Sequence, residues 1–440
     1  MNIHRTHRVG RLPTEILELI LRSFIESCDP FTDIKAIFLL RRVCSRWQAI
    51  CDKTPMLWTQ PYFHRSKSPS LNREIVSTIL SRSGNLPVSV TIDLMGPAGY
   101  APEAVLDYQP LFAVQDRLEN LEIAVQPGDV IQCTKEFPKF PILASVDITM
   151  ADDSPSELQA LGKIFLSSCP SLRAFSLTVY NVLLHPPPIP SLPLHQLISL
   201  TLLLPVRDAT LYDMLIQCPL LEECHVGEVE EMGEVHELPI HTMPALRFLN
   251  YSAAECCLGD VLRRLRFPLL DSLTVGSARP GCDLPWDPVE ILLELHEGVP
   301  FQLLSLTMSG LDITPEEFAP LLQFAGPTLQ ILAFVDMPYV LKPSFFTGLI
   351  FPRLATLEIR CNSEAVDETA LLQLVDLLWA HRGESNAAFP ALRQVQLQMN
   401  GVLFDEAVEE RLASVEEESN GFFRDLWDRG EGVEVEEIYE

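Results

Sequence analysis

A short apolar motif recurs along most of the chain, and this repetition limits the folds that the sequence can adopt. The motif is Pro-x-Leu-x-x-Leu-x-Leu, loosely kept, and its core begins at eleven places. Most steps between successive copies are 24 to 29 residues long, with two longer steps of 33 and 38 residues. The first core leucines are Leu118, Leu143, Leu172, Leu197, Leu221, Leu246, Leu270, Leu303, Leu329, Leu354 and Leu392. A unit of this length cannot bury its apolar face alone, so neighbouring units must stack and share a core.

Each copy of the motif predicts a short strand, because its alternate apolar positions place side chains on one face. The intervening segments predict helices that return on the outside, and apolar residues have helical spacing at 158–169, 209–218, 315–324 and 367–381. The proline before a copy ends the preceding helix, since its ring cannot continue one. The period is typical of leucine-rich repeats, so we expect an α/β solenoid with parallel strands on its concave face and helices outside.

The N-terminal segment differs from the rest in charge and in periodicity. Residues 1–82 contain 13 basic and 7 acidic residues, which leaves 19 basic and 53 acidic residues for the remainder. From Leu12 the apolar residues fall on one helical stripe, and Pro13 suits the first turn of a helix because its missing N–H has no partner to lose. A second apolar run covers 34–40, and a third helix should end before Pro55. We therefore expect a small helical module here.

This module resembles the F-box family over residues 9–60. It has the Leu-Pro-x-Glu-Ile-Leu opening at Leu12, a Val-Cys-x-x-Trp core at Val43 and a closing Leu57-Trp58. The connection between the first and third helices is longer than is usual in the family. With the repeats that follow, the chain resembles fungal-type F-box proteins with C-terminal leucine-rich repeats.

The resemblance implies that the module binds a Skp adaptor and, through it, a cullin. The residues that it assigns to the adaptor contact are Leu12, Pro13, Ile16, Leu17, Ile20, Val43 and Trp47. The alternative is that three helices merely cap the solenoid, which would bury Leu12 and Pro13 instead of leaving them exposed.

Four segments follow from these patterns. The F-box-like module covers 9–60, and 61–115 is a linker with a degenerate first repeat or cap, including a helix at 71–83 and a strand at 88–92. The solenoid covers 116–400, and 401–440 is an acidic tail with 14 acidic and 3 basic residues from Asp405 onward. Such charge density resists compaction, but Phe422, Phe423, Leu426 and Trp427 have helical spacing, so part of the tail can form a cap.

Several classes of function have no support in the sequence. A formal net charge of −28 argues against nucleic acid as a partner, and no apolar stretch is long enough to predict a membrane span. No phosphate loop, catalytic elbow or metalloprotease motif is present, so we expect no enzyme activity and no cofactor. Cys224, His225, His236 and His241 match no common zinc spacing, and eleven scattered cysteines indicate reduced thiols in cytoplasm or nucleus.

The leading hypothesis is a substrate-recognition subunit of an SCF-type E3 ubiquitin ligase, in which the solenoid captures a target protein. The alternative is a repeat scaffold outside any ligase. Strand alternation predicts which side chains face the concave surface, and an apolar strip beside polar groups favours its C-terminal half as the target site. The predicted residues are Val335, Glu358, Arg360, Gln394 and Gln396. The acidic run 228–237, expected to project between two repeats, is a second candidate for a basic target. For both sets the alternative is that the residues are simply exposed to solvent.

Overall fold

The chain folds as two compact units, Met1–Leu197 and Ile198–Glu440. The computed structural model describes residues 12–27, 36–64, 69–95, 114–126, 139–152, 158, 169–181, 192–230, 238–253, 259–277, 292–295, 302–311, 313–346, 351–361, 367–380, 389–399, 404, 406–419 and 421–424. Among these residues, no helix of either unit is long and apolar enough to cross a membrane.

The first unit begins with a group of short helices around one apolar core. The elements are α1 (Thr14–Ser27), α2 (Ala36–Arg41), α3 (Ser45–Lys53), the 3-10 turn η2 (Pro55–Trp58) and α4 (Pro69–Arg82). The first helix starts directly after Pro13, whose carbonyl accepts the amide of Leu17 at 3.1 Å, as its sequence predicts. Trp58 is almost completely buried and donates its indole N–H to the carbonyl of Cys51 at 2.7 Å.

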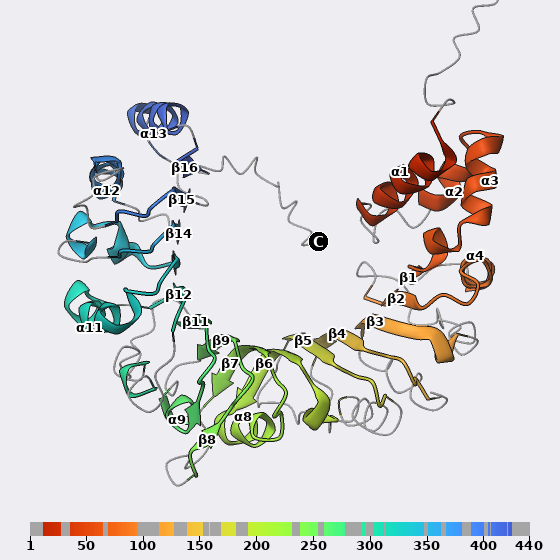
Figure 1. The fold of residues 1–440 in the computed structure, drawn as a ribbon, viewed down its shortest axis with the longest axis horizontal. Coiled ribbons are helices and arrows are strands. Elements are labelled where there is room, and N and C mark those ends of the chain that lie inside the picture. The colour runs from red at the N-terminus through yellow and green to blue at the C-terminus, as the bar shows by residue number, and fades with distance from the viewer. Residues whose placement is uncertain are drawn as a thin grey trace, which may run out of the picture. The chain divides into compact units, whose positions relative to one another are not determined.

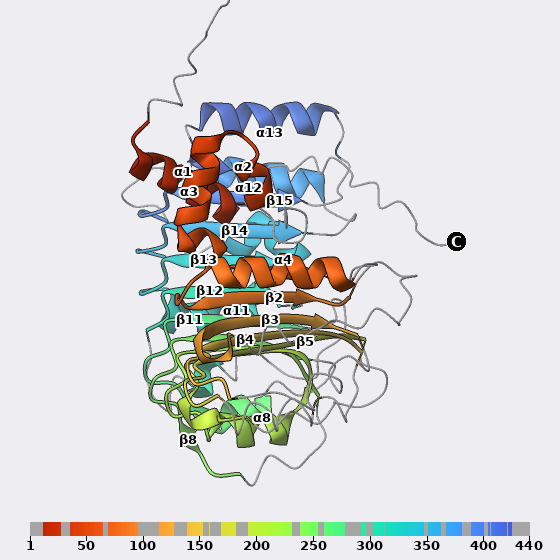
Figure 2. The same cartoon turned by 90° about the vertical axis from the view of Figure 1, so that its right-hand side faces the viewer.

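Parallel strands complete the first unit. Strands β1 (Tyr62–His64), β2 (Val88–Asp93), β3 (Leu118–Val125), β4 (Ser145–Asp152) and β5 (Ala174–Asn181) pair in chain order, with the short turns η3 (Gln115–Arg117) and η4 (Leu194–Gln196) before two repeats. The helix and strand expected at 71–83 and 88–92 are confirmed as α4 and β2. Strand β1 was not predicted, because it falls in the segment assigned to a linker. Figure 2 shows β2 to β5 running side by side with α4 alongside.

The second unit contains a longer parallel sheet. Its strands pair in the order β6 (Ser199–Arg207), β7 (Glu223–Glu230), β9 (Phe248–Ala253), β11 (Ser272–Ser277), β12 (Ser305–Ser309), β13 (Ile331–Val335), β14 (Thr356–Cys361), β15 (Gln394–Met399) and β16 (Phe423–Arg424). Two short strands, β8 (His241–Thr242) and β10 (Leu265–Arg266), pair separately. Every one of the eleven predicted motif copies therefore contains a parallel strand, which confirms the predicted positions of these strands.

The apolar alternation that predicted the strands also describes how they pack. In β14, Leu357 and Ile359 are buried while Thr356 and Glu358 are only partly covered. The first core leucine of a typical copy, such as Leu246, is completely buried. Parallel strands with one apolar face covered by helices fit the predicted α/β, solenoid-like fold.

The returning segments of the second unit lie on one side of its sheet. They are α8 (Asp208–Leu215), α9 (Gly259–Arg263), α11 (Pro315–Ala325), α12 (Glu368–Ala380) and α13 (Glu406–Glu418), and Figure 1 shows them along the same side of their strands. The segment between β13 and β14 differs, since it returns through two 3-10 turns, η6 (Pro338–Leu341) and η7 (Pro343–Phe346). We call the sheet face opposite these segments the open face. The helix predicted at 158–169 lies outside the described residues, apart from its two ends.

Two local expectations were wrong. Phe422 and Phe423 do not lie on a helix: Phe423 belongs to β16, which pairs with β15, and both rings pack against Trp379 of α12. The start of the acidic run is also not a projecting loop, because Glu228 and Glu230 continue strand β7. The remainder of that run, Leu426, Trp427 and His236 lie outside the described residues.

Candidate adaptor-binding surface

Helix α1 has an apolar arc that is wider than the core beneath it requires. At about 100° per residue, Leu17 and Leu21 point into the helical core, where Leu17 is 0% exposed. Ile16, Leu19 and Ile20 continue the arc around the helix but face solvent, and Leu19 is 62% exposed. Exposed side chains of this size, set side by side on a helix, are typical of a protein contact.

A second helix adds to this apolar surface. Leu39 on α2 and Val43 in the turn before α3 lie four residues apart, and they are 58% and 59% exposed. Phe24 lies one turn beyond Ile20 on α1 and is also exposed. We define the apolar helical surface by its members, which are Ile16, Leu19, Ile20, Phe24, Leu39 and Val43.

The structure divides the residues that the resemblance assigned to the adaptor. Pro13, Ile16, Ile20 and Val43 are exposed. Leu12 and Trp47 are half-buried and pack against the helical core. The assignment of Leu17 to the adaptor contact was wrong, because its side chain is enclosed by the core and is not available to a partner. Leu12 is half-buried and Pro13 is exposed. The pair is therefore neither fully exposed, as adaptor binding predicts, nor fully buried, as a cap on the solenoid predicts.

Sequence reasoning missed three members of the surface: Leu19, Phe24 and Leu39. Their signal was present, since Leu19 and Phe24 lie three and four residues from Ile16 and Ile20 on the same helix. An apolar stripe on a helix does not itself show which of its residues are covered by the protein's own core. The packing of α2, α3 and η2 against α1 decides this.

Polar contacts hold the helices that carry this surface. The guanidinium of Arg46 on α3 donates to the carbonyl of Leu12, at the start of α1. Thr54, after α3, donates its hydroxyl to the carboxylate of Glu18 on α1 at 3.2 Å. Because these contacts join both ends of α3 to the N-terminal part of α1 and to Leu12 before it, they fix how α1 lies on the module.

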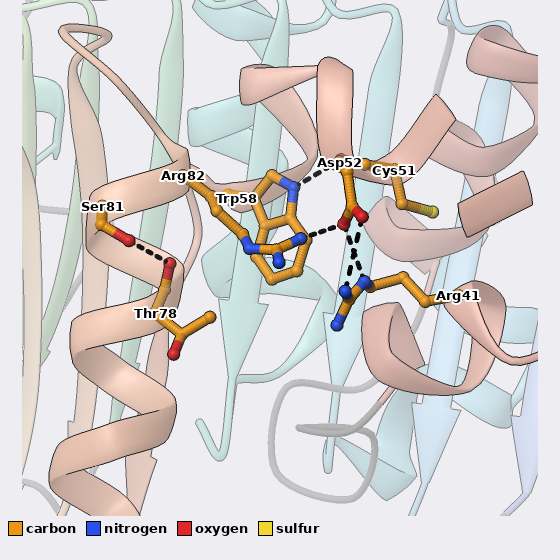
Figure 3. Close-up of polar contacts among 7 residues, drawn as sticks. All are labelled: Arg41, Cys51, Asp52, Trp58, Thr78, Ser81 and Arg82. Carbon is orange, nitrogen blue, oxygen red and sulfur yellow. Dashed lines mark hydrogen bonds and ion pairs between the residues drawn. The ribbon is translucent and has the colours of Figure 1, made fainter. Parts of the chain in front are cut away.

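A charged cluster joins α2, α3 and α4, and Figure 3 shows its side chains. Asp52 on α3 accepts hydrogen bonds from Arg41 on α2, at 2.8 Å and 3.4 Å, and from Arg82 on α4. Both guanidinium groups also lie near the ring of Trp58, with centroid distances of 5.9 Å for Arg41 and 4.7 Å for Arg82. We call Arg41, Asp52, Trp58 and Arg82 the Asp52 cluster.

The electrostatics of the cluster favour the ionised carboxylate. Burial by itself raises the pKa of Asp52, but hydrogen bonds from Arg41 and Arg82, together with their positive charges, outweigh it. The pKa of Asp52 is consequently lowered from its ordinary value of 3.8. Each arginine is a partner that keeps its charge at any physiological pH.

A comparison with protein families now identifies the module. The F-box-like family model matches residues 9–64. The chain therefore carries an F-box-like domain at its N-terminal side, which includes α1, α2, α3, η2 and β1. F-box domains bind Skp adaptors, and the apolar helical surface belongs to this domain. The comparison with curated proteins found no match.

The residues predicted to bind a target are brought together by the second unit. Val335 pairs in register with Arg360, and Glu358 pairs with Gln396, so strands β13, β14 and β15 place them on the open face. Gln394 lies at the start of the same face of β15. Arg360 and Glu358 form an ion pair at 2.9 Å, so their charges partly satisfy each other. No observation tests whether they contact a target.

The thiols and imidazoles show no metal-binding arrangement within the described ranges, where no group of three or more such ligands occurs. Cys224 lies in β7 with its side chain on the buried face of the strand, whereas the next residue, His225, lies on the opposite face with its ring against Phe248. Burial raises the pKa of Cys169 and of Cys218 to about 12. Both thiols therefore act as small apolar core groups, as expected from their positions.

Proposed function

We propose that this protein is the substrate-recognition subunit of an SCF-type E3 ubiquitin ligase. The observation that carries the proposal is an F-box-like domain whose α1 and α2 leave large apolar side chains in solvent. A Skp adaptor would cover this surface, and a few central side chains would supply most of the binding free energy. The adaptor would connect the chain to a cullin in the cytoplasm or nucleus.

The remainder of the chain would capture the target. We assign its units to the leucine-rich-repeat type, on the basis of the motif period and of the strand in each copy. Repeats of this kind present an extended surface, and the open face of β13 to β15 combines half-buried Val335 with polar Glu358 and Arg360. Binding there would raise the target's effective concentration near the ubiquitin-charged enzyme. The chain itself would make or break no bond.

Co-purification of the full chain from cells tests the adaptor step. The double variant Leu19→Ser with Leu39→Ser should lose the Skp adaptor and the cullin together, because it removes apolar area from both helices. The matched control is Leu269→Ser, since Leu269 is also a largely exposed leucine but lies in the second unit. Recovery of adaptor and cullin with the double variant would contradict the proposed surface.

The same experiment separates the proposal from a scaffold outside any ligase. A ligase subunit should recover both adaptor and cullin, whereas a scaffold that uses the adaptor alone should recover no cullin. Proximity labelling with the proteasome inhibited should then identify candidate targets, whose amounts rise when the chain is removed.

A second variant tests the target surface. Replacing Val335, Glu358, Arg360 and Gln396 together by alanine should stop degradation of an identified target without changing adaptor recovery. The control is the pair Ser176→Ala and Thr178→Ala on β5, which alters polar strand positions in the first unit. Normal degradation in the four-residue variant would mean that the target binds elsewhere.

A further inference from the structure

Helix α4 belongs to the core of the F-box-like domain although it follows that domain in the chain. Ile79 of α4 lies in the same buried cluster as Leu17, Leu57 and Trp58, and Ile75 packs against this cluster. The last residue of α4, Arg82, reaches Asp52 on α3 and lies over the buried ring of Trp58. Two other polar side chains of α4 visible in Figure 3, Thr78 and Ser81, instead bond carbonyls of their own helix.

The same end of α4 is also tied to the sheet. Arg117, immediately before β3, donates to the carbonyl of Leu80 at 2.6 Å, to the hydroxyl of Ser83 at 2.8 Å and to the carbonyl of Leu86 at 2.9 Å. These contacts satisfy groups at a helix C-terminus, where carbonyls lack partners within the helix. Burial lowers the pKa of this guanidinium. The end of α4 is thus held by Arg82 on the domain side and by Arg117 on the sheet side.

Backbone hydrogen bonds between the segment after η2 and strand β2 add to these side-chain contacts. The carbonyls of Thr59 and Pro61 accept the amides of Ser89 and Thr91, at 2.9 Å and 3.1 Å, so the chain leaving η2 pairs at once with β2. A single hydrogen-bonded strip can twist about its own axis. A second connection through α4, away from that strip, opposes such a rotation.

We propose that Arg82 and Asp52 are positioning residues, which lock the adaptor-binding helices to the first strands of the sheet as one rigid body. This inference rests on the proposed function, because a fixed geometry matters where a bound target must reach the ubiquitin-charged enzyme. Neither residue touches the adaptor or the target in this role. Their contribution is orientation rather than affinity.

The contact between Arg82 and Asp52 can be removed without unfolding the protein. If Arg82 is replaced, Asp52 retains Arg41 as a partner, so no carboxylate is left without a counter-charge. The apolar contacts of Ile75 and Ile79 also remain. Arg82→Gln should therefore fold, while the ion pair between α3 and the last residue of α4 is lost. Arg82→Lys keeps a cation that can pair with Asp52 and lie over Trp58.

The first measurement is the distance distribution between two spin labels in the full chain. The labels are introduced as unnatural amino acids at Ser23 on α1 and Glu119 on β3, both exposed, so that native thiols do not interfere. The native chain should give one narrow distribution and Arg82→Gln a clearly broader one, with Arg82→Lys restoring the narrow form. Arg411→Gln is the matched control, because it breaks an exposed ion pair with Asp376 between α13 and α12. An unchanged width in Arg82→Gln would overturn the proposal.

The second measurement is ubiquitin transfer in a reconstituted ligase, with a probe lysine introduced by Asp147→Lys at an exposed position of β4. Arg82→Gln should lower transfer to this lysine by about threefold or more at unchanged adaptor affinity, and Arg82→Lys should restore it. Equal transfer despite a broader distribution would refute the positioning role. If the native complex binds adaptor but transfers no ubiquitin, the proposed function fails, and the label distances still decide whether the lock exists.

Discussion

Two leucines on one turn of α1 should respond oppositely to the same substitution. Leu19 is 62% exposed and Leu17 is 0% exposed. Full burial of a leucine side chain contributes about 1.5–3 kcal/mol, so covering the exposed part of Leu19 by an adaptor is worth about 1–2 kcal/mol. Leu19→Ala should therefore weaken adaptor binding by about 5- to 30-fold. Its free energy of unfolding should change by less than about 0.5 kcal/mol, as is usual at exposed positions.

Leu17→Ala supplies the matched comparison. It removes a buried side chain from the helical core and should lower the free energy of unfolding of the first unit by about 2–5 kcal/mol. Titration calorimetry with purified Skp adaptor gives the affinities, and urea unfolding followed by circular dichroism gives the stabilities. Native affinity in Leu19→Ala would refute the assignment of the apolar helical surface. A loss of stability in Leu19→Ala equal to that in Leu17→Ala would show that Leu19 is a core residue.

Further predictions concern the repeat core, the thiols and the charged cluster. Leu249→Ala should lower the free energy of unfolding by about 2–5 kcal/mol, because Leu249 is buried. Hydrogen exchange should rise in the paired strands β7 and β11 as well as in β9, because stacked repeats stabilise one another. An effect confined to β9 would contradict the shared core. Cys218, with a pKa of about 12, should resist alkylation at pH 8 in the native chain, whereas exposed Cys44 should be modified before Cys218, as mass spectrometry can show. Since the pKa of Asp52 is lowered in the folded chain, its stabilisation is present above about pH 4 and is lost as the pH falls through the lowered value. Asp52→Asn should remove that part of the acid sensitivity, and identical acid-unfolding curves would refute the assignment.

Local periodicity was sufficient to predict most of the architecture. The strand of a typical copy begins two residues after its first core leucine, as in Leu246 and β9. This works because a repeat contacts mainly its neighbours in the chain, so the pattern within one unit already specifies its packing. The F-box-like domain could also be read from short motifs, and the match at 9–64 lies close to the predicted 9–60.

The sequence by itself thus determined the repeating strands, the helices α8, α11 and α12 between some of them, and the presence of an F-box-like module. Tertiary structure alone decided which part of the α1 arc is exposed, because Leu17 and Leu19 have the same apolar character and only the packing of α2, α3 and η2 distinguishes them. It also decided the pairing of Asp52 with Arg82, which are 30 positions apart. Hydrophobic periodicity records the direction of a side chain within its own helix or strand. Contacts between charged groups on different helices depend on how those helices pack, and no local pattern encodes that arrangement.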